Sequence, residues 1–153
     1  MSVGIKVGSI PIDLVPGRKQ GGHTTDHSLY KSKAQTWIQT NVDLHISLIQ
    51  KSQRLDEIRA LKIWRALHKL EFPSFYLELT VLDALHGKRA GAVASNVWTV
   101  FEYLRDKFAG ALAIDPANSN NKASDELTVT EKRLVAQKAA ASLTATNWNH
   151  ILW

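Results

Sequence analysis

Hydrophobic positions follow two different patterns along the chain. In the first 40 residues they occur in short runs separated by glycine, proline and polar residues, a pattern typical of short β-strands. From about residue 41 onward they recur every three to four positions over longer segments, as they do in α-helices. The pattern therefore predicts an α+β fold, in which a small antiparallel or mixed sheet fragment precedes a bundle of about five helices.

Four short strands are expected before residue 41. The first 15 residues contain two of them, broken at Gly8-Ser9. Pro11 places the second strand at a sheet edge or at its own start, because proline cannot donate a backbone hydrogen bond. Two further strands are expected at HSLYK (27–31) and TWIQT (36–40).

Helix boundaries can be predicted for the first three helices. Thr40 or Asn41 can cap a first helix, which extends to about Gln53. Pro73 suits the first turn of the third helix, and Gly87 ends it. The second helix lies between them, at about residues 55–70.

The last third of the chain is expected to hold two more helices and one long loop. A fourth helix covers about residues 92–108. The segment IDPANSNNKASDEL (114–127) is expected to be a turn-rich loop. Thr128 and Glu131 form a T-x-x-E capping box, which opens a last helix to about Thr146.

Composition narrows the class of protein. With 153 residues, 44% of them hydrophobic, and five tryptophans, the chain is expected to form a globular domain with its own core. No apolar run approaches the ~20 residues that span a bilayer, so no membrane partner is expected. Cysteine is absent, which excludes disulfides and thiolate metal sites and favours a cytoplasmic location.

The net charge of +5 is unevenly distributed. Residues 1–72 carry 11 Lys and Arg against six Asp and Glu, whereas residues 73–153 carry eight of each. The positive excess therefore lies in the first half of the chain. This asymmetry favours an anionic ligand bound there over a uniformly basic surface.

Four cations of the second predicted helix fall within about 120° of one face at 100° per residue. One interpretation is a solvated basic face whose aliphatic stems cover apolar neighbours. The other is a phosphate cradle, because lysine serves phosphate as a compact point charge. The four residues are Arg59, Lys62, Arg65 and Lys69.

Ser74, at the start of the third predicted helix, favours the cradle. A helix N-terminus presents free N–H groups and the positive end of the helix dipole, and a hydroxyl adds a further donor. A lysine on one helix and this serine on the next can hold the same polyphosphate. The simpler alternative is that Ser74 only caps its helix, although Glu78 is one residue too far along for a capping box.

These residues resemble a known family. The pattern K-x-W (62–64), followed by P-S-F-x-L-E-L (73–79), is similar to the C-terminal half of the CD-NTase and oligoadenylate-synthase group of nucleotidyltransferases, within the DNA polymerase β-like superfamily. Three other motifs resemble the family in the expected order, and together they cover essentially the whole chain. They are IPIDLVP (10–16), TWIQTNVDLH (36–45) and IDPANSNN (114–121).

The resemblance implies a function and a set of site residues. Enzymes of this group make nucleotide second messengers from nucleoside triphosphates, in antiviral defence among other roles. Asp13 would be the third carboxylate of a two-Mg²⁺ site, and ATP or GTP would be the substrate. Lys62 and Ser74 would hold the triphosphate, and Phe75 would stack on the base. Arg65, from the cationic face, is a further candidate for binding the nucleotide.

The roles of several of these residues stay open. A core position is an equally good interpretation of Phe75, and Glu78 is expected to face either Lys62 or a helix terminus. Asp115, with Asn120 or Asn121, is expected to shape a loop near the site rather than to take part in the chemistry.

One departure from the family decides how the chain is interpreted. Family members begin with a G-S motif and a D-x-D pair, and neither the pair nor room for its strand precedes Asp13. We therefore expect residues 1–40 to be a remnant of the catalytic sheet and residues 41–153 to be the helical nucleotide-binding lobe. The chain would be a fragment, a late-start product, half of a split enzyme whose partner polypeptide supplies the missing half, or a divergent pseudoenzyme.

The alternative function is a non-catalytic module that binds nucleotide or RNA. Two-metal catalysis requires carboxylates that hold both ions, which Asp13 cannot do by itself. A basic surface can bind RNA, although an excess of five charges is modest for that purpose.

Overall fold

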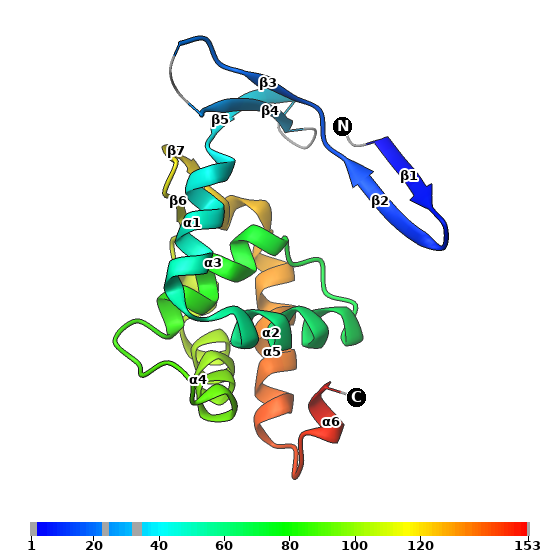
Figure 1. Cartoon of the computed structure of the whole chain (residues 1–153). Coiled ribbons are helices and arrows are strands. Elements are labelled where there is room, and N and C mark those ends of the chain that lie inside the picture. The colour runs from blue at the N-terminus through cyan, green and yellow to red at the C-terminus, as the bar shows by residue number, and fades with distance from the viewer. Residues whose placement is uncertain (1–2, 23–24, 32–34, 153) are drawn as a thin grey trace.

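A computed structural model describes residues 3–22, 25–31 and 35–152 (Figure 1). It confirms the α+β class, with short antiparallel strands at the N-terminus followed by helices. All four predicted strands before residue 41 are present. The strands are β1 (Val3–Val7), β2 (Ile10–Leu14), β3 (Gly17–Lys19), β4 (His27–Lys31), β5 (Thr36–Thr40), β6 (Ile114–Asp115) and β7 (Asn118–Lys122).

The helices follow the predicted order. None of the helices in the described residues is long and apolar enough to cross a membrane. The helices are α1 (Val42–Ser52), α2 (Leu55–Leu67), α3 (Ser74–Ala84), α4 (Val93–Asp106), α5 (Val129–Leu143) and α6 (Asn149–Leu152), with two 3₁₀ turns, η2 (Phe108–Gly110) and η3 (Ala123–Glu126).

Strands β1 and β2 form an antiparallel hairpin with the two-residue turn Gly8-Ser9. Gly8 has a φ of 63°, a conformation that glycine adopts without steric cost. Among the described strands, β1 and β2 pair only with each other, and Figure 1 shows the hairpin extending away from the helices. The strands β3, β4 and β5 form a separate antiparallel sheet in that order.

Two of the predicted helix caps are confirmed. The side chain of Asn41 accepts a hydrogen bond from the backbone N–H of Leu44 and caps α1. Thr128 and Glu131 form the predicted capping box at the start of α5, each accepting a backbone N–H of the other residue.

Helix α2 ends at Leu67, three residues before its predicted end. Lys69 adopts the left-handed conformation with a φ of 51°, while Leu70 N–H bonds to Arg65 C=O and Lys69 N–H bonds to Ala66 C=O. This pair of bonds is a Schellman motif. The sequence does not predict this motif, because the left-handed position is usually occupied by glycine and here it is occupied by lysine.

The segment 114–127 is more regular than the predicted loop. Strands β6 and β7 pair in an antiparallel hairpin, and the 3₁₀ turn η3 follows. Polar residues fill β7, which has the sequence NSNNK, so no alternating hydrophobic pattern marks it as a strand.

The hydrophobic core lies among α2, α3, α4 and α5. Trp64, at the centre of α2, is fully buried, packs against Phe101 of α4 and donates its indole N–H to Ser142 Oγ of α5 at 2.9 Å. Phe108 packs against Phe72 and so closes one side of the core. These contacts anchor α2 to α4 and α5, and they hold Phe72, which precedes α3, against η2. Helix α2 and the start of α3 carry most of the predicted nucleotide-binding residues.

Candidate functional site

A cavity of about 510 Å³ lies between the β3–β4–β5 sheet and the start of α3. Leu29 of β4 and Ile38 of β5 form its apolar wall on the sheet side. Phe75 of α3 lines it on the helical side, and Asn121 and Glu126 add polar groups. The remaining lining residues are Val15, Tyr30, Pro73, Tyr76 and Ala123. The structure thus places Phe75 at a cavity rather than in the core.

Lys62 pairs with Glu78 across the interface of α2 and α3. Lys62 Nζ lies 2.5 Å from Glu78 Oε1, and the two side chains are 36% and 17% exposed. Of the two orientations expected for Glu78, the one toward Lys62 is therefore observed. The pair holds the ammonium group at a partly exposed position from which it can exchange the carboxylate for another anion.

Arg65 joins α2 to the N-terminus of α3. Its Nη1 donates to the carbonyl oxygen of Phe72 at 2.6 Å and to Ser74 Oγ at 3.0 Å. Ser74 is exposed and is the first residue of α3. Ser74 thus directly precedes the cavity residue Phe75, and a cation already approaches its hydroxyl.

The other two cations of the predicted cradle lie elsewhere. Arg59 pairs with Asp56 on its own helix at 3.1 Å, and the Arg59 side chain is 70% exposed. Lys69 lies beyond the end of α2, at the left-handed position. The expected face of four cations is therefore reduced to Lys62 and Arg65, and the solvated interpretation applies to Arg59.

Phe75 belongs to a network that the sequence analysis did not anticipate. The ring of His45, in α1, stacks on Phe75 with a centroid distance of 3.9 Å and an interplanar angle of 21°. His45 Nε2 lies 2.7 Å from Asp115 Oδ1, and Asp115 is 2% exposed. Asn121 Nδ2 donates to the other oxygen of Asp115 at 3.0 Å. The prediction that Asp115 and Asn121 shape the loop near the site agrees with these contacts.

His45 was missed because a single histidine in an amphipathic helix carries no signal of its own. Its position at the end of TWIQTNVDLH, a motif already singled out, was the only available indication. The partner Asp115 lies 70 residues away in the sequence, so the pair becomes visible only in the folded chain.

Asp13 lies in β2, opposite Gly4 of β1. Among the described residues, no group of three or more His, Asp or Glu side chains could hold a metal ion. Asp13 as a ligand of Mg²⁺ stays a prediction.

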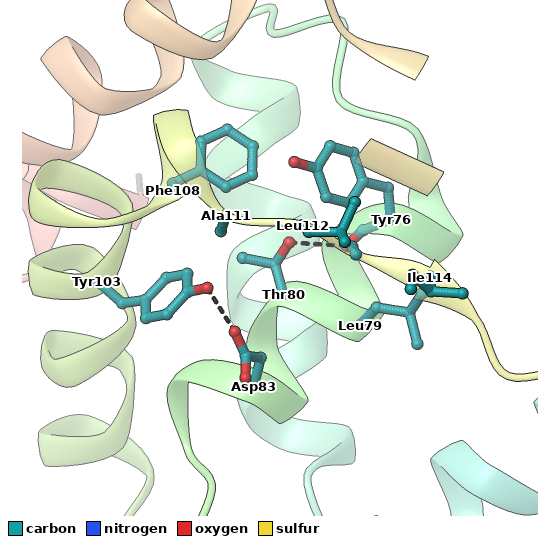
Figure 2. A pocket seen from close by; sticks show the side chains of 10 residues that line it. Tyr76, Leu79, Thr80, Asp83, Tyr103, Phe108, Ala111, Leu112 and Ile114 are labelled. Carbon is teal, nitrogen blue, oxygen red and sulfur yellow. Dashed lines mark hydrogen bonds between the residues drawn. The ribbon is translucent and has the colours of Figure 1, made fainter. Parts of the chain in front are cut away.

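A second cavity, of about 190 Å³, lies between α3, α4 and the segment 111–114 (Figure 2). Tyr103 donates its hydroxyl to Asp83 at the edge of this cavity, and burial together with that hydrogen bond raises the pKa of Tyr103. Tyr76 also lines it. None of the described side chains that line this cavity is a cation, so it is a poor site for a polyphosphate.

Two solved structures are similar to the chain over 99% of its length. One is CdnC of E. coli MS115-1 with ATP, at a TM-score of 0.78 and 18% identity. The other is the complex of CdnC of the same strain with HORMA-deltaN, at a TM-score of 0.72 and 20% identity. The chain spans 63% and 62% of those CdnC chains, respectively.

Sequence comparison adds no further relative, since no family model and no curated protein matches the chain. The fold likeness agrees with the resemblance that the motifs indicated, because CdnC is a CD-NTase. The chain therefore shares the fold of the matched part of CdnC.

Proposed function

We propose that the chain is the nucleotide-binding part of a nucleotidyltransferase of the CD-NTase and oligoadenylate-synthase type. In the proposed reaction a hydroxyl group attacks the α-phosphorus of ATP or GTP, and pyrophosphate leaves. The observation that carries the proposal lies at the start of α3, where Arg65 donates to Ser74 Oγ and the next residue, Phe75, lines the cavity. Lys62 pairs with Glu78, one turn further along α3. CdnC, which has a similar fold, has been solved with ATP.

The triphosphate would be held where α2 meets the start of α3. Lys62 would exchange Glu78 for a phosphate oxygen, while Glu78 keeps the lysine side chain in place before the nucleotide arrives. Arg65 would bring its guanidinium and the hydroxyl of Ser74 to the same anion, next to the free N–H groups of the first turn of α3. Each group contributes a donor to one compact, negatively charged ligand.

The base would occupy the cavity between Phe75 and the β4–β5 face. A volume of about 510 Å³ falls within the range of roughly 300–1,000 Å³ that is usual for small-molecule sites. Stacking on an aromatic side chain contributes about 1–3 kcal/mol per base. Asn121 and Glu126 would then face the polar edge of the base.

The carboxylates that Mg²⁺ requires would come largely from outside these 153 residues. Asp13 supplies one, and a further segment, in the same polypeptide or in a partner, would supply the others. Two observations support this part of the proposal. Among the described strands, the hairpin strands β1 and β2 pair only with each other, and the CdnC chain is longer, since this chain covers 63% of it. A protein partner is also part of the proposal, because CdnC has been solved in complex with HORMA-deltaN.

The test of the binding site is calorimetry with ATP. Lys62→Ala should weaken ATP binding by about 1.5–3 kcal/mol, the range for hydrogen bonds to charged groups. Arg59→Ala is the matched control, because Arg59 lies one turn earlier on the same helix and is largely exposed. Equal small losses in both variants would show that α2 presents only a solvated basic face and would overturn the proposal.

A non-catalytic nucleotide-binding module is the second candidate, and the Arg65–Ser74 contact beside the cavity at Phe75 would serve it equally well. An assay for pyrophosphate release, with Mg²⁺ and mixed nucleoside triphosphates, separates the two candidates. The 153-residue chain alone should release none in either case. Release upon addition of the segment that carries the missing carboxylates would establish the enzyme. RNA as a ligand stays a prediction from the charge asymmetry alone.

A further inference from the structure

We infer that Asp115 is the positioning residue of the proposed base cavity, holding its aromatic wall through His45 and its polar wall through Asn121. The inference rests on the proposed function, because it concerns the same cavity. Asp115 does not itself line the cavity and acts only through His45 and Asn121.

The aromatic wall depends on His45. The His45 ring lies flat against Phe75 at 3.9 Å between centroids, so it occupies one face of the phenylalanine and leaves the rest of that ring to the cavity. An aromatic ring that is packed on one side has few alternative rotamers, and a nucleobase that stacks on it pays little to order it. His45 is itself fixed, because its Nε2 lies 2.7 Å from Asp115 Oδ1.

The polar wall depends on the other oxygen of the same carboxylate. Asn121 Nδ2 donates to Asp115 Oδ2 at 3.0 Å, which fixes the orientation of the amide. With its nitrogen turned toward Asp115, Asn121 can offer its carbonyl oxygen to the cavity as a hydrogen-bond acceptor. A base that presents an N–H group at this edge is the ligand that such a wall accommodates.

Asp115 can carry out both tasks because the surrounding fold holds it firmly. It is 2% exposed at the end of β6, and its Oδ1 also accepts the backbone N–H of Ala117 at 2.8 Å. Three donors from α1, the β6–β7 turn and β7 therefore meet at one buried carboxylate. A displacement of this group would disturb two walls of one cavity at once.

The experiment compares the binding of ATP with the binding of inorganic tripolyphosphate, which lacks the base. His45→Ala should weaken ATP binding about two- to tenfold, the effect of removing one aromatic contact, and leave tripolyphosphate binding unchanged. Asp115→Ala should weaken ATP binding at least as much, because both walls lose their anchor. His45→Phe, which keeps the stack without the hydrogen bond, should recover part of the loss seen in His45→Ala.

Asp106→Asn is the matched control, since Asp106 is an exposed carboxylate on α4, outside the network. Thermal melts identify any variant that fails to fold. If Asp115→Ala does not fold, the comparison of His45→Phe with His45→Ala still tests the inference. Equal losses for ATP and tripolyphosphate would overturn the inference. So would a gain in ATP affinity in His45→Ala, which would mean that His45 occupies the place of the base. A wild-type chain that binds neither ligand would overturn the proposed function, and the inference with it.

Discussion

The helical region, residues 42–152, and the strand region, residues 3–40, differ in how far their apolar side chains are buried. Every buried hydrophobic residue among the described side chains lies in the helical region, from Ile58 to Ile151. In the strand region the described side chains include one buried residue, Thr40. The β1–β2 hairpin instead exposes its apolar groups, with Val7 58% and Ile10 63% accessible.

This difference indicates where the stability of the chain originates. Burial of apolar area contributes roughly 25 cal/mol per Å², so the helices supply nearly all of that term and the hairpin supplies little. An isolated two-stranded hairpin is marginally stable in water. The helical region, which includes Phe75 at the cavity, is therefore expected to determine the stability of the whole chain. The strand region is expected to become more stable when a further segment covers it.

The largest expected effect is the loss of a core aromatic. Phe101→Ala should lower the free energy of unfolding by about 3–5 kcal/mol, because Phe101 is fully buried in α4 against Trp64. Ile10→Ala, in the exposed hairpin, should change it by no more than about 0.5 kcal/mol. Urea unfolding followed by tryptophan fluorescence measures both. Similar losses in the two variants would show that the hairpin belongs to the same cooperative unit as the core.

The second effect is a loss of stability at high pH that originates in the helical region. Burial, with a smaller contribution from the nearby Asp125, raises the pKa of Tyr76 to about 12 from its ordinary value of 10. The unfolded chain therefore ionises first as the pH rises. The stabilising contribution is fully present below pH 10 and is lost progressively between pH 10 and 12, by up to about 2–3 kcal/mol.

Tyr76→Phe is the control for this pH dependence. The hydroxyl of Tyr76 is buried and has no hydrogen-bond partner among the described residues, so its removal should leave stability at pH 7 unchanged or increase it by about 1 kcal/mol. Thermal melts from pH 8 to 11 should then decline less steeply in the variant than in the wild type. Identical slopes would assign the alkaline loss to other groups, such as Tyr103.

A smaller effect is expected at the start of α5. Thr128→Ala should cost about 1 kcal/mol, because it removes the side-chain acceptor of the capping box. Thr130→Ala is the control, since Thr130 lies exposed in the first turn of the same helix. The free energy of unfolding from urea titrations measures both. If the cap contributes nothing, the two variants will unfold at the same urea concentration.

The sequence was sufficient where structure depends on neighbouring residues and insufficient where it depends on distant ones. The strands β1, β2, β4 and β5, a cap of α1 at Thr40 or Asn41, and the Thr128 capping box were predicted because each signal lies within a few residues. The end of α2 was misplaced because Lys69 takes a left-handed position that normally signals itself through glycine.

The same distinction applies to the candidate site. Lys62 and Ser74 were selected from short motifs. The structure pairs Lys62 with Glu78 of α3 and places Ser74 at the start of that helix, in contact with Arg65. The His45–Asp115 contact joins residues 70 positions apart, and the strand β7 contains only polar residues. Neither feature produces a periodic or local signal, so only the folded arrangement reveals them.

The smallest expected effect on stability is also the sharpest test of the hairpin. The outer edges of β1 and β2 have no partner among the described strands, and such edges pair readily with other chains. Because apolar residues also lie uncovered there, the isolated chain is expected to self-associate through residues 3–15.

Ile12→Lys should reduce that self-association, because a charge on an exposed edge disfavours strand pairing. The free energy of unfolding should change by no more than about 0.5 kcal/mol, since Ile12 is already 37% exposed. Ser9→Lys adds the same charge at the hairpin turn, away from the apolar positions, and serves as the control. Light scattering across a concentration series should show larger particles for the wild type and Ser9→Lys than for Ile12→Lys. A wild-type chain that stays monomeric throughout would mean that the hairpin needs no covering segment, which would remove one support for carboxylates supplied from outside these 153 residues.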